Sequence, residues 1–336
     1  SLAIKQGSQD MKGLATSYMN MGNVYKFLGN HPKAEDYYNQ ALEISKSIND
    51  EQGRALALGS IAALKLEIND YETAIHFAKQ SLEIAQAIDL KGTVKEAHRQ
   101  LGWAYNATFV PEWAENEYLQ VISMNHEDIS RNFSILSECE KELFFRTVAE
   151  DFDRFHSFAF RRMRTNPNIT QTVYNNLLKN KGLLLKSSTA MRTAIFSSNN
   201  HELILNYERW IQVRQEIARL YTLPVEQRTT DPQELERIAN NLERLLVRSS
   251  TEFSDFDKSL RVEWTNIRDR LGDGEAAIEF TNFAHTRDSV LYCALVIKKD
   301  SENPLMLPLF EEKRLEKTLG SFGGNNLTYI NEVYGT

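Results

Sequence analysis

The sequence predicts a mostly α-helical protein: a solenoid of helical hairpins, then a helical connector, then the first strands of an α/β domain. Similar residues recur every 40 positions up to about residue 130, and apolar residues continue at spacings of three and four to about residue 270. Runs rich in β-branched and aromatic residues follow. Only 7 Pro and 15 Gly interrupt the 336 residues, which favours helix. We therefore expect three parts, residues 1–130, 131–270 and 271–336.

The composition argues against several classes of function. The formal net charge of −7 disfavours broad binding to nucleic acid or to acidic membranes, and no apolar run reaches the length of a membrane span. Two cysteines, Cys139 and Cys293, give neither a disulfide framework nor a zinc quartet and suit a reducing compartment. The 7 histidines show no metal-ligand spacing. We expect a cytoplasmic protein with a protein or peptide partner, and without metal, cofactor, membrane or nucleic-acid ligand.

The 40-residue register becomes visible when the sequence is aligned on itself. The coinciding positions are Ala34, Ala74 and Ala114; Leu42, Leu82 and Ile122; Gly22, Ala62 and Gly102; and Tyr25 and Tyr105. The small residues would let two antiparallel helices approach closely, and the aromatic residues would fill the space beside them. This order of large, small and aromatic residues is typical of tetratricopeptide-type helical hairpins.

The length and the start of the register carry two further expectations. The common tetratricopeptide repeat has about 34 residues, so a period of 40 implies longer helices or longer turns between repeats. Turn signals lie at Gly29-Asn30, Asn49-Asp50, Asn69-Asp70 and Asp89-Leu90. The same register aligns Ser1 with Ser81, partway along a second helix. We therefore expect that the array begins inside a repeat and that the natural protein has at least one more hairpin upstream.

The first helices of the hairpins would line a concave surface, where we predict a protein-binding groove. The candidate residues are Asn23, Lys26 and Phe27 from the first hairpin and Arg99, Trp103 and Asn106 from the third. Tetratricopeptide domains that capture a C-terminal carboxylate repeat Lys and Asn along this surface, and here only Asn23 fits, because Met19 and Gly59 depart from the pattern. The alternative is that Trp103 and Phe27 pack against the next hairpin as core residues.

Beyond residue 130 the period fails, but helical spacing continues. We predict helices over residues 136–149, 171–185, 201–220 and 233–246. The pattern then changes to strand-length runs over residues 276–283, 290–297 and 305–310, followed by a helix over 311–319. These elements would open a larger α/β domain that continues past Thr336.

The amino-acid sequences of the connector and the strands resemble those of a known family. The segments concerned are Asn180-Lys181-Gly182-Leu183-Leu184-Leu185, Gly274-Glu275-Ala276-Ala277-Ile278-Glu279-Phe280, Tyr292-Cys293-Ala294-Leu295-Val296 and Pro308-Leu309-Phe310. With the repeats before them, the whole chain resembles bacterial tetratricopeptide proteins that carry a CHAT domain. The resemblance implies a caspase-like cysteine peptidase fold, in which a His polarises a Cys thiol that attacks a peptide carbonyl. The segments expected to carry them, similar to Ala-Thr-His-Gly and Leu-Ser-Ala-Cys-Glu, are absent from this chain.

One segment, Leu136-Ser137-Glu138-Cys139-Glu140, is similar to the second of those motifs. It lies in a helical run, whereas a caspase-like nucleophile follows a strand, and its flanking carboxylates disfavour the thiolate that catalysis needs. Cys293 lies in an apolar strand and is expected to be a small buried residue. We therefore predict no catalytic residue in this chain.

Two functions remain open at this point. In the first, the chain is the recognition and regulatory portion of a caspase-like cysteine peptidase, without the catalytic His and Cys. In the second, it is a non-enzymatic interaction scaffold with a degenerate α/β domain. The sequence past Thr336 would separate the two.

Overall fold

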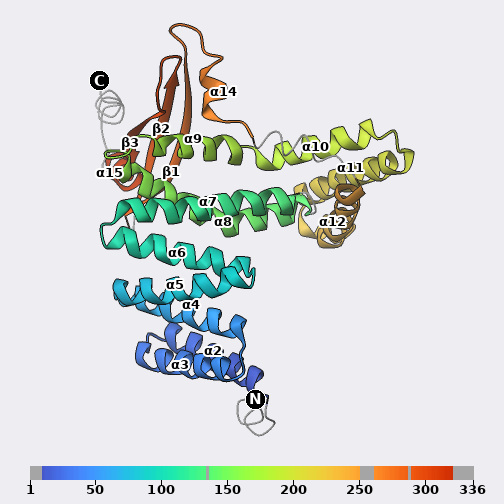
Figure 1. Cartoon of the computed structure of the whole chain (residues 1–336). Coiled ribbons are helices and arrows are strands. Elements are labelled where there is room, and N and C mark those ends of the chain that lie inside the picture. The colour runs from blue at the N-terminus through green and yellow to red at the C-terminus, as the bar shows by residue number, and fades with distance from the viewer. Residues whose placement is uncertain (1–9, 134–135, 250–260, 287–288, 321–336) are drawn as a thin grey trace. The chain divides into compact units, whose positions relative to one another are not determined.

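A computed structural model describes residues 10–133, 136–249, 261–286 and 289–320 (Figure 1). Its internal contacts divide the chain into two units, Ser1–Met124 and Asn125–Thr336, which we describe separately. The predicted start of the array partway along a second helix falls on residues 1–9 and lies outside the described residues. The predicted boundaries at residues 130 and 270 stay predictions.

The first unit is a stack of helices of uniform length. Its helices are α2 (Met11–Phe27), α3 (His31–Ser47), α4 (Glu51–Glu67), α5 (Tyr71–Ala87), α6 (Lys91–Ala107) and the beginning of α7 (Pro111–Phe133). Each helix from α2 to α6 has 17 residues, and the turns between repeats are as short as those within them. The 40-residue period therefore comes from long helices and not from long turns between repeats.

Every turn of this unit has the same backbone geometry. One residue with positive φ recurs every 20 positions: Gly29, Asn49, Asn69, Asp89 and Phe109. At the first turn the Gly29 amide donates to the Lys26 carbonyl and the Asn30 amide to the Tyr25 carbonyl, both at 2.9 Å, which is a Schellman motif. The Asn30 side chain then accepts a hydrogen bond from the Lys33 amide and caps α3. One three-residue joint thus ends one helix and begins the next, at the turns that the sequence predicted.

Within a hairpin, the two helices approach closely where a small residue on the first helix faces a large residue on the second. A Cβ atom on Gly22 of α2 would lie 2.4 Å from Cε1 of Tyr38 on α3, and one on Gly102 would lie 3.1 Å from Cε1 of Tyr118. In the middle hairpin both corresponding positions, Ala62 and Ala78, are Ala and are buried. The predicted role of the small residues is therefore confirmed.

The second unit continues with helices of varied length. After the end of α7 these are α8 (Glu138–Arg162), α9 (Ile169–Asn180), α10 (Leu183–Ser197), α11 (His201–Thr222), the short η1 (Val225–Gln227), α12 (Pro232–Ser249) and α14 (Trp264–Arg268). The Asp231 carboxylate caps the start of α12, where it accepts a hydrogen bond from the Gln233 amide at 3.0 Å. Helices α10, α11 and α12 share an apolar core around Met191, Trp210 and Leu246.

The prediction of one helix over residues 171–185 was wrong. The chain leaves the helical conformation at Lys181, and Gly182 has a φ of 66°. A left-handed residue cannot continue a right-handed helix, so α9 ends at Asn180 and α10 begins at Leu183.

A three-stranded antiparallel sheet follows, in the order β1-β2-β3. Its elements are β1 (Ala276–Thr286), β2 (Ser289–Lys298) and β3 (Leu305–Glu311), followed by α15 (Glu312–Gly320). Helices α8 and α9 contact β1, and the side chains of this inner face, including Phe283, Cys293 and Leu295, are buried. The three predicted strands and the helix after them are confirmed.

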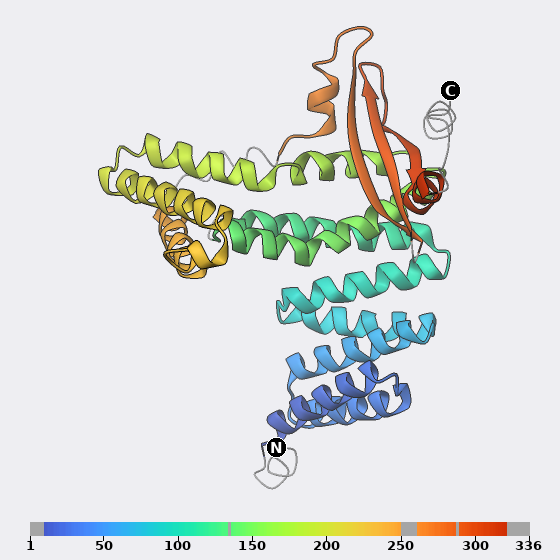
Figure 2. The same cartoon turned by 180° about the vertical axis from the view of Figure 1, so that it is seen from behind.

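The opposite face of the sheet, turned to the viewer in Figure 2, is also apolar. Directly opposed residues form three rows across the strands: Ile278, Val296 and Leu305; Phe280, Ala294 and Leu307; Asn282, Tyr292 and Phe310. Phe280 is 69% exposed, Leu305 58% and Ile278 50%, and the rings of Tyr292 and Phe310 stack at 4.6 Å. This surface, which we call the outer sheet face, has the composition of a buried face.

Candidate protein-binding groove

The six predicted groove residues lie on two helices of the first unit. Asn23, Lys26 and Phe27 are on α2, and Arg99, Trp103 and Asn106 are on α6. Helix α4 contacts both α2 and α6, so it lies between the two groups (Figure 1). We call this surface of α2, α4 and α6 the groove.

Helix α4 contributes two small residues to this surface, and we call them the floor of the groove. Gly59 and Ala63 are half-buried there, at the register positions of Arg99 and Trp103. The Gln100 side chain of α6 donates to the Gly59 carbonyl at 3.0 Å and ties the two first helices together. Gly59 and Ala63 themselves add little side-chain volume, whereas Leu56, one turn earlier on α4, is 44% exposed.

The two aromatic candidates are accessible. Phe27 is 90% exposed and Trp103 is 43% exposed. Leu101 and Ala104, the neighbours of Trp103 on α6, are buried. Trp103 therefore lies on the side of α6 that faces away from the hairpin core. Neither aromatic side chain is buried against a neighbouring hairpin, and both offer the large, rigid contact area that is enriched at protein interfaces.

The side chain of Asn23 is held in place by Tyr38 of α3, a contact that the sequence did not predict. The Tyr38 hydroxyl donates to Oδ1 of Asn23 at 2.8 Å. Burial, with a smaller effect from the nearby Glu67 carboxylate, raises the pKa of Tyr38 to about 12, so the phenol stays a donor at neutral pH. The bond therefore fixes which way the exposed Asn23 amide is turned.

Basic side chains precede Trp103 on α6. Lys95, Arg99 and Trp103 are spaced by four residues and therefore share one helix face. Nη1 of Arg99 forms an ion pair with Oε2 of Glu96 at 2.9 Å. Lys95 was not among the predicted residues, although the spacing of four in the sequence was sufficient to find it.

Sequence reasoning also missed two exposed aromatic residues at the turn between α6 and α7. Phe109 is 90% exposed and Trp113 56% exposed. Lys79 of α5 lies 5.5 Å from the centroid of the Trp113 ring, within cation–π range. Phe109 takes the left-handed position that is Gly, Asn or Asp at the other turns. That unusual residue type, read in the 20-residue series, was the available signal.

The cysteines do not form a nucleophilic site with described residues. Cys139 is exposed on the first turn of α8, and its neighbours Glu138 and Glu140 pair with Arg214 and Arg244 at 2.9 Å each. Cys293 is fully buried in β2, and burial raises the pKa of its thiol to about 11. A protonated, inaccessible thiol is a packing residue.

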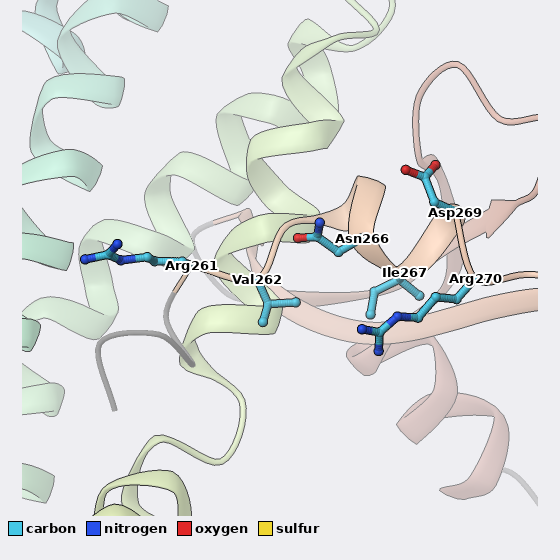
Figure 3. A pocket seen from close by; sticks show the side chains of 6 residues that line it. All are labelled: Arg261, Val262, Asn266, Ile267, Asp269 and Arg270. Carbon is cyan, nitrogen blue, oxygen red and sulfur yellow. The ribbon is translucent and has the colours of Figure 1, made fainter. Parts of the chain in front are cut away.

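A depression lies beside α14 in the second unit. Figure 3 shows its lining residues, Arg261, Val262, Asn266, Ile267, Asp269 and Arg270. The charged ends of Arg261, Asp269 and Arg270 point in different directions, and the Asp269 carboxylate pairs with Arg268 at 2.8 Å. These groups do not converge on a common ligand position.

Two further observations concern the described residues alone. They contain no group of three His, Cys, Asp or Glu side chains that could hold a metal ion. Their helices include none that is long and apolar enough to cross a membrane.

Comparison with known proteins agrees with this geometry. Residues 13–87 match the family model of the tetratricopeptide repeat. The helical hairpins of these residues are thus of the tetratricopeptide type. The chain is 28% identical over 109 residues to Tetratricopeptide repeat protein 29 of Trypanosoma brucei brucei, which is 32% of this chain and 22% of that protein. It is 34% identical over 59 residues to human G-protein-signaling modulator 1, or 18% of this chain and 9% of that protein. The matches thus span less than a quarter of either relative.

Proposed function

We propose that this chain is the protein-binding and regulatory portion of a caspase-like cysteine peptidase. Tetratricopeptide repeats are protein-binding scaffolds whose stacked helices create extended concave surfaces. The observation that carries the binding function is the exposure of two aromatic side chains on first helices, Phe27 on α2 and Trp103 on α6. Helix α4, with the half-buried Gly59 and Ala63, contacts both of these helices. In this proposal a protein or peptide segment lies across the floor of the groove.

The outer sheet face supports the second half of the proposal. A sheet with two apolar faces needs a layer on each. Helices α8 and α9 contact β1, and α15 contacts β2 and β3, yet Ile278, Phe280 and Leu305 of the outer sheet face remain at least half exposed. A larger α/β domain would supply the second layer, as the resemblance to CHAT-domain proteins implies. Because Cys139 is on a helix and Cys293 is buried, this chain alone is then expected to cleave no peptide.

A paired variant tests the groove. The full chain with Trp103→Ala and Arg99→Glu, used as bait in lysate of the source organism, should lose the partners that the unaltered chain retains. The matched control is Trp113→Ala with Lys46→Glu, which makes the same chemical changes on α7 and α3, outside the groove. Equal retention by both variants, with unaltered melting curves, would place the binding site elsewhere.

The peptidase part has its own test. In the natural protein, a His followed by Gly after one strand and a Cys after the next, both beyond Thr336, would support it. If the polypeptide lacks them, the non-enzymatic scaffold remains. Peptide cleavage by the present chain that disappears in Cys139→Ala would contradict the assignment of Cys139 as non-catalytic.

A further inference from the structure

The charges of the first unit are sorted between its two kinds of helix. The first helices, α2, α4 and α6, contain seven Lys or Arg and three Asp or Glu, a net charge of +4. The second helices, α3, α5 and residues 111–124 of α7, contain three Lys and eight Asp or Glu, a net charge of −5. This asymmetry stands out in a chain whose overall charge is −7.

Part of the positive charge is used between helices and part lies in the groove. Lys65 forms an ion pair with Glu35 of α3 at 2.8 Å and is largely buried. Lys95 and Arg99 lie on the helix face that carries Trp103. Arg99 forms an ion pair with Glu96, which is three residues away on the same helix. Such pairs on a helix surface contribute only about 0.3–0.5 kcal/mol, so a ligand carboxylate can compete with Glu96.

We infer that the groove recognises an extended acidic segment of a partner protein. Its side-chain carboxylates would lie against Lys95 and Arg99, and an apolar side chain next to them would lie against Trp103. Arg presents a planar fork of donors that matches a carboxylate, while Gly59 and Ala63 leave room for the backbone of the segment. This inference rests on the protein-binding function proposed above and names the chemistry of the partner.

The negative second helices strengthen the selectivity. An acidic segment is attracted by the first helices and repelled by the second, so the charge pattern selects one side of the solenoid for the encounter. A C-terminal carboxylate is not required, since the side chains that would repeat along a carboxylate-capturing surface are replaced by Met19 and Gly59. The groove therefore suits acidic residues within a chain.

A peptide-display selection on the full chain tests this inference. Random 12-residue peptides without a free C-terminus are selected on the immobilised protein at low salt, and enriched sequences are remade as labelled peptides for fluorescence polarisation. We expect enriched peptides with several Asp or Glu beside an aromatic or branched apolar residue. Replacing Asp and Glu by Asn and Gln should weaken binding about tenfold or more, and raising the salt concentration should do the same.

Variants separate the two levels of the proposal. Lys95→Glu with Arg99→Glu should weaken binding of the selected peptides about tenfold, whereas Lys33→Glu with Lys46→Glu on α3, the same charge change on a second helix, should not. Free-acid and amidated peptides should bind equally. If the enriched peptides are neutral or basic and their binding still requires Trp103, the acidic specificity would be overturned, but the groove would remain the binding site. Enriched peptides that are insensitive to Trp103→Ala would overturn both.

Discussion

The ring of Tyr38 lies so close to Gly22 that a Cβ atom on Gly22 would be 2.4 Å from Cε1 of the ring. Tyr38 is fully buried and packs with α4 residues such as Leu58 and Ile61, so the ring has little room to move. We expect Gly22→Ala to lower the free energy of unfolding of the first unit by about 1–2 kcal/mol. Overpacking by about 1–3 kcal/mol exceeds the gain of up to about 1 kcal/mol from replacing a helical Gly.

Denaturant unfolding followed by hydrogen exchange of the α2 and α3 peptides measures this effect. Gly92→Ala is the matched control, because a Cβ atom there meets no atom within 4 Å and should leave the unit equally or more stable. In a Tyr38→Ala background, which imitates the Ala62 and Ala78 pair, Gly22→Ala should stabilise. A destabilisation that persists in that background would mean that Tyr38 is not its cause.

Phe109 is an aromatic residue in the left-handed conformation, with a φ of 60°. This conformation costs a bulky side chain about 1–2 kcal/mol, whereas Asn tolerates it. Phe109→Asn should therefore raise the melting temperature of the first unit and its free energy of unfolding by about 1 kcal/mol. Asn49→Phe, the reverse exchange at an equivalent joint, should lower both. A lower melting temperature for Phe109→Asn would show that the exposed ring contributes contacts that outweigh the strain.

His156 makes the second unit sensitive to acid. The side chain is buried between α8 and β1, with its ring 6.5 Å from that of Phe283, and both ring nitrogens are unpartnered among the described residues. Burial lowers the pKa of His156 to about 4. Because the folded state favours the neutral ring, stability is complete above the unfolded pKa of 6.5 and falls by about 3 kcal/mol as the pH drops to 4.

The measurement for His156 is unfolding of the second unit at pH 7 and pH 4. His156→Leu should be at least as stable at pH 7, since it removes two unsatisfied nitrogens, and should lose about 3 kcal/mol less on acidification. The control is His201→Leu, which changes an exposed residue at the start of α11. Equal acid loss in His156→Leu and the unaltered chain would contradict the assignment.

Glu243 should act in the opposite direction. Its carboxylate is buried and accepts a hydrogen bond from the Glu138 amide at 2.6 Å. The positive charge of Lys141, a buried residue whose ammonium donates to Ser187 at 2.7 Å, acts on this carboxylate. Burial, the largest effect, raises the pKa of Glu243 to about 7. A raised pKa means that stability is present below the unfolded pKa of 4.5 and is lost as the pH rises to 7.

The test compares Glu243→Gln with the unaltered chain across that window. The variant keeps an acceptor for the Glu138 amide but cannot ionise, so relative to the unaltered chain it should gain about 3 kcal/mol between pH 4.5 and pH 7. Glu234→Gln, at an exposed position on the same helix, should show no such gain. A constant difference between Glu243→Gln and the unaltered chain would mean that Glu243 is ionised throughout.

The repeats were predictable because the turns between helices and the packing contacts between helices both recur at fixed sequence intervals. The left-handed joints are occupied by residues that favour them at Gly29, Asn49 and Asn69, and the pairs of small and large residues repeat in register. Gly182 was missed because a single Gly within an apolar periodic run is compatible with a helix, and only the φ value shows the break.

The candidate groove was predictable as a face of helices but not in its internal contacts. Register placed Trp103 and Phe27 on the first helices, and only the structure shows that both side chains are exposed. The bond from Tyr38 to Asn23 joins residues 15 positions apart on different helices, and that between Lys141 and Ser187 joins residues 46 positions apart. No periodicity encodes such pairs. The strands were readable from their composition, but the second apolar face became visible only once β3 was in register with β2.

The left-handed joint that recurs every 20 residues also restricts how this array can change in length. Inserting or deleting 20 residues would preserve every joint but exchange first and second helices downstream. The packing pairs of small and aromatic residues, such as Gly102 and Tyr118, would then be out of register with the hairpins before them. A change of 40 residues preserves both joints and faces. Growth or shrinkage of the solenoid is therefore tolerated only in whole hairpins, and the span of partner surface that it can cover varies in discrete steps.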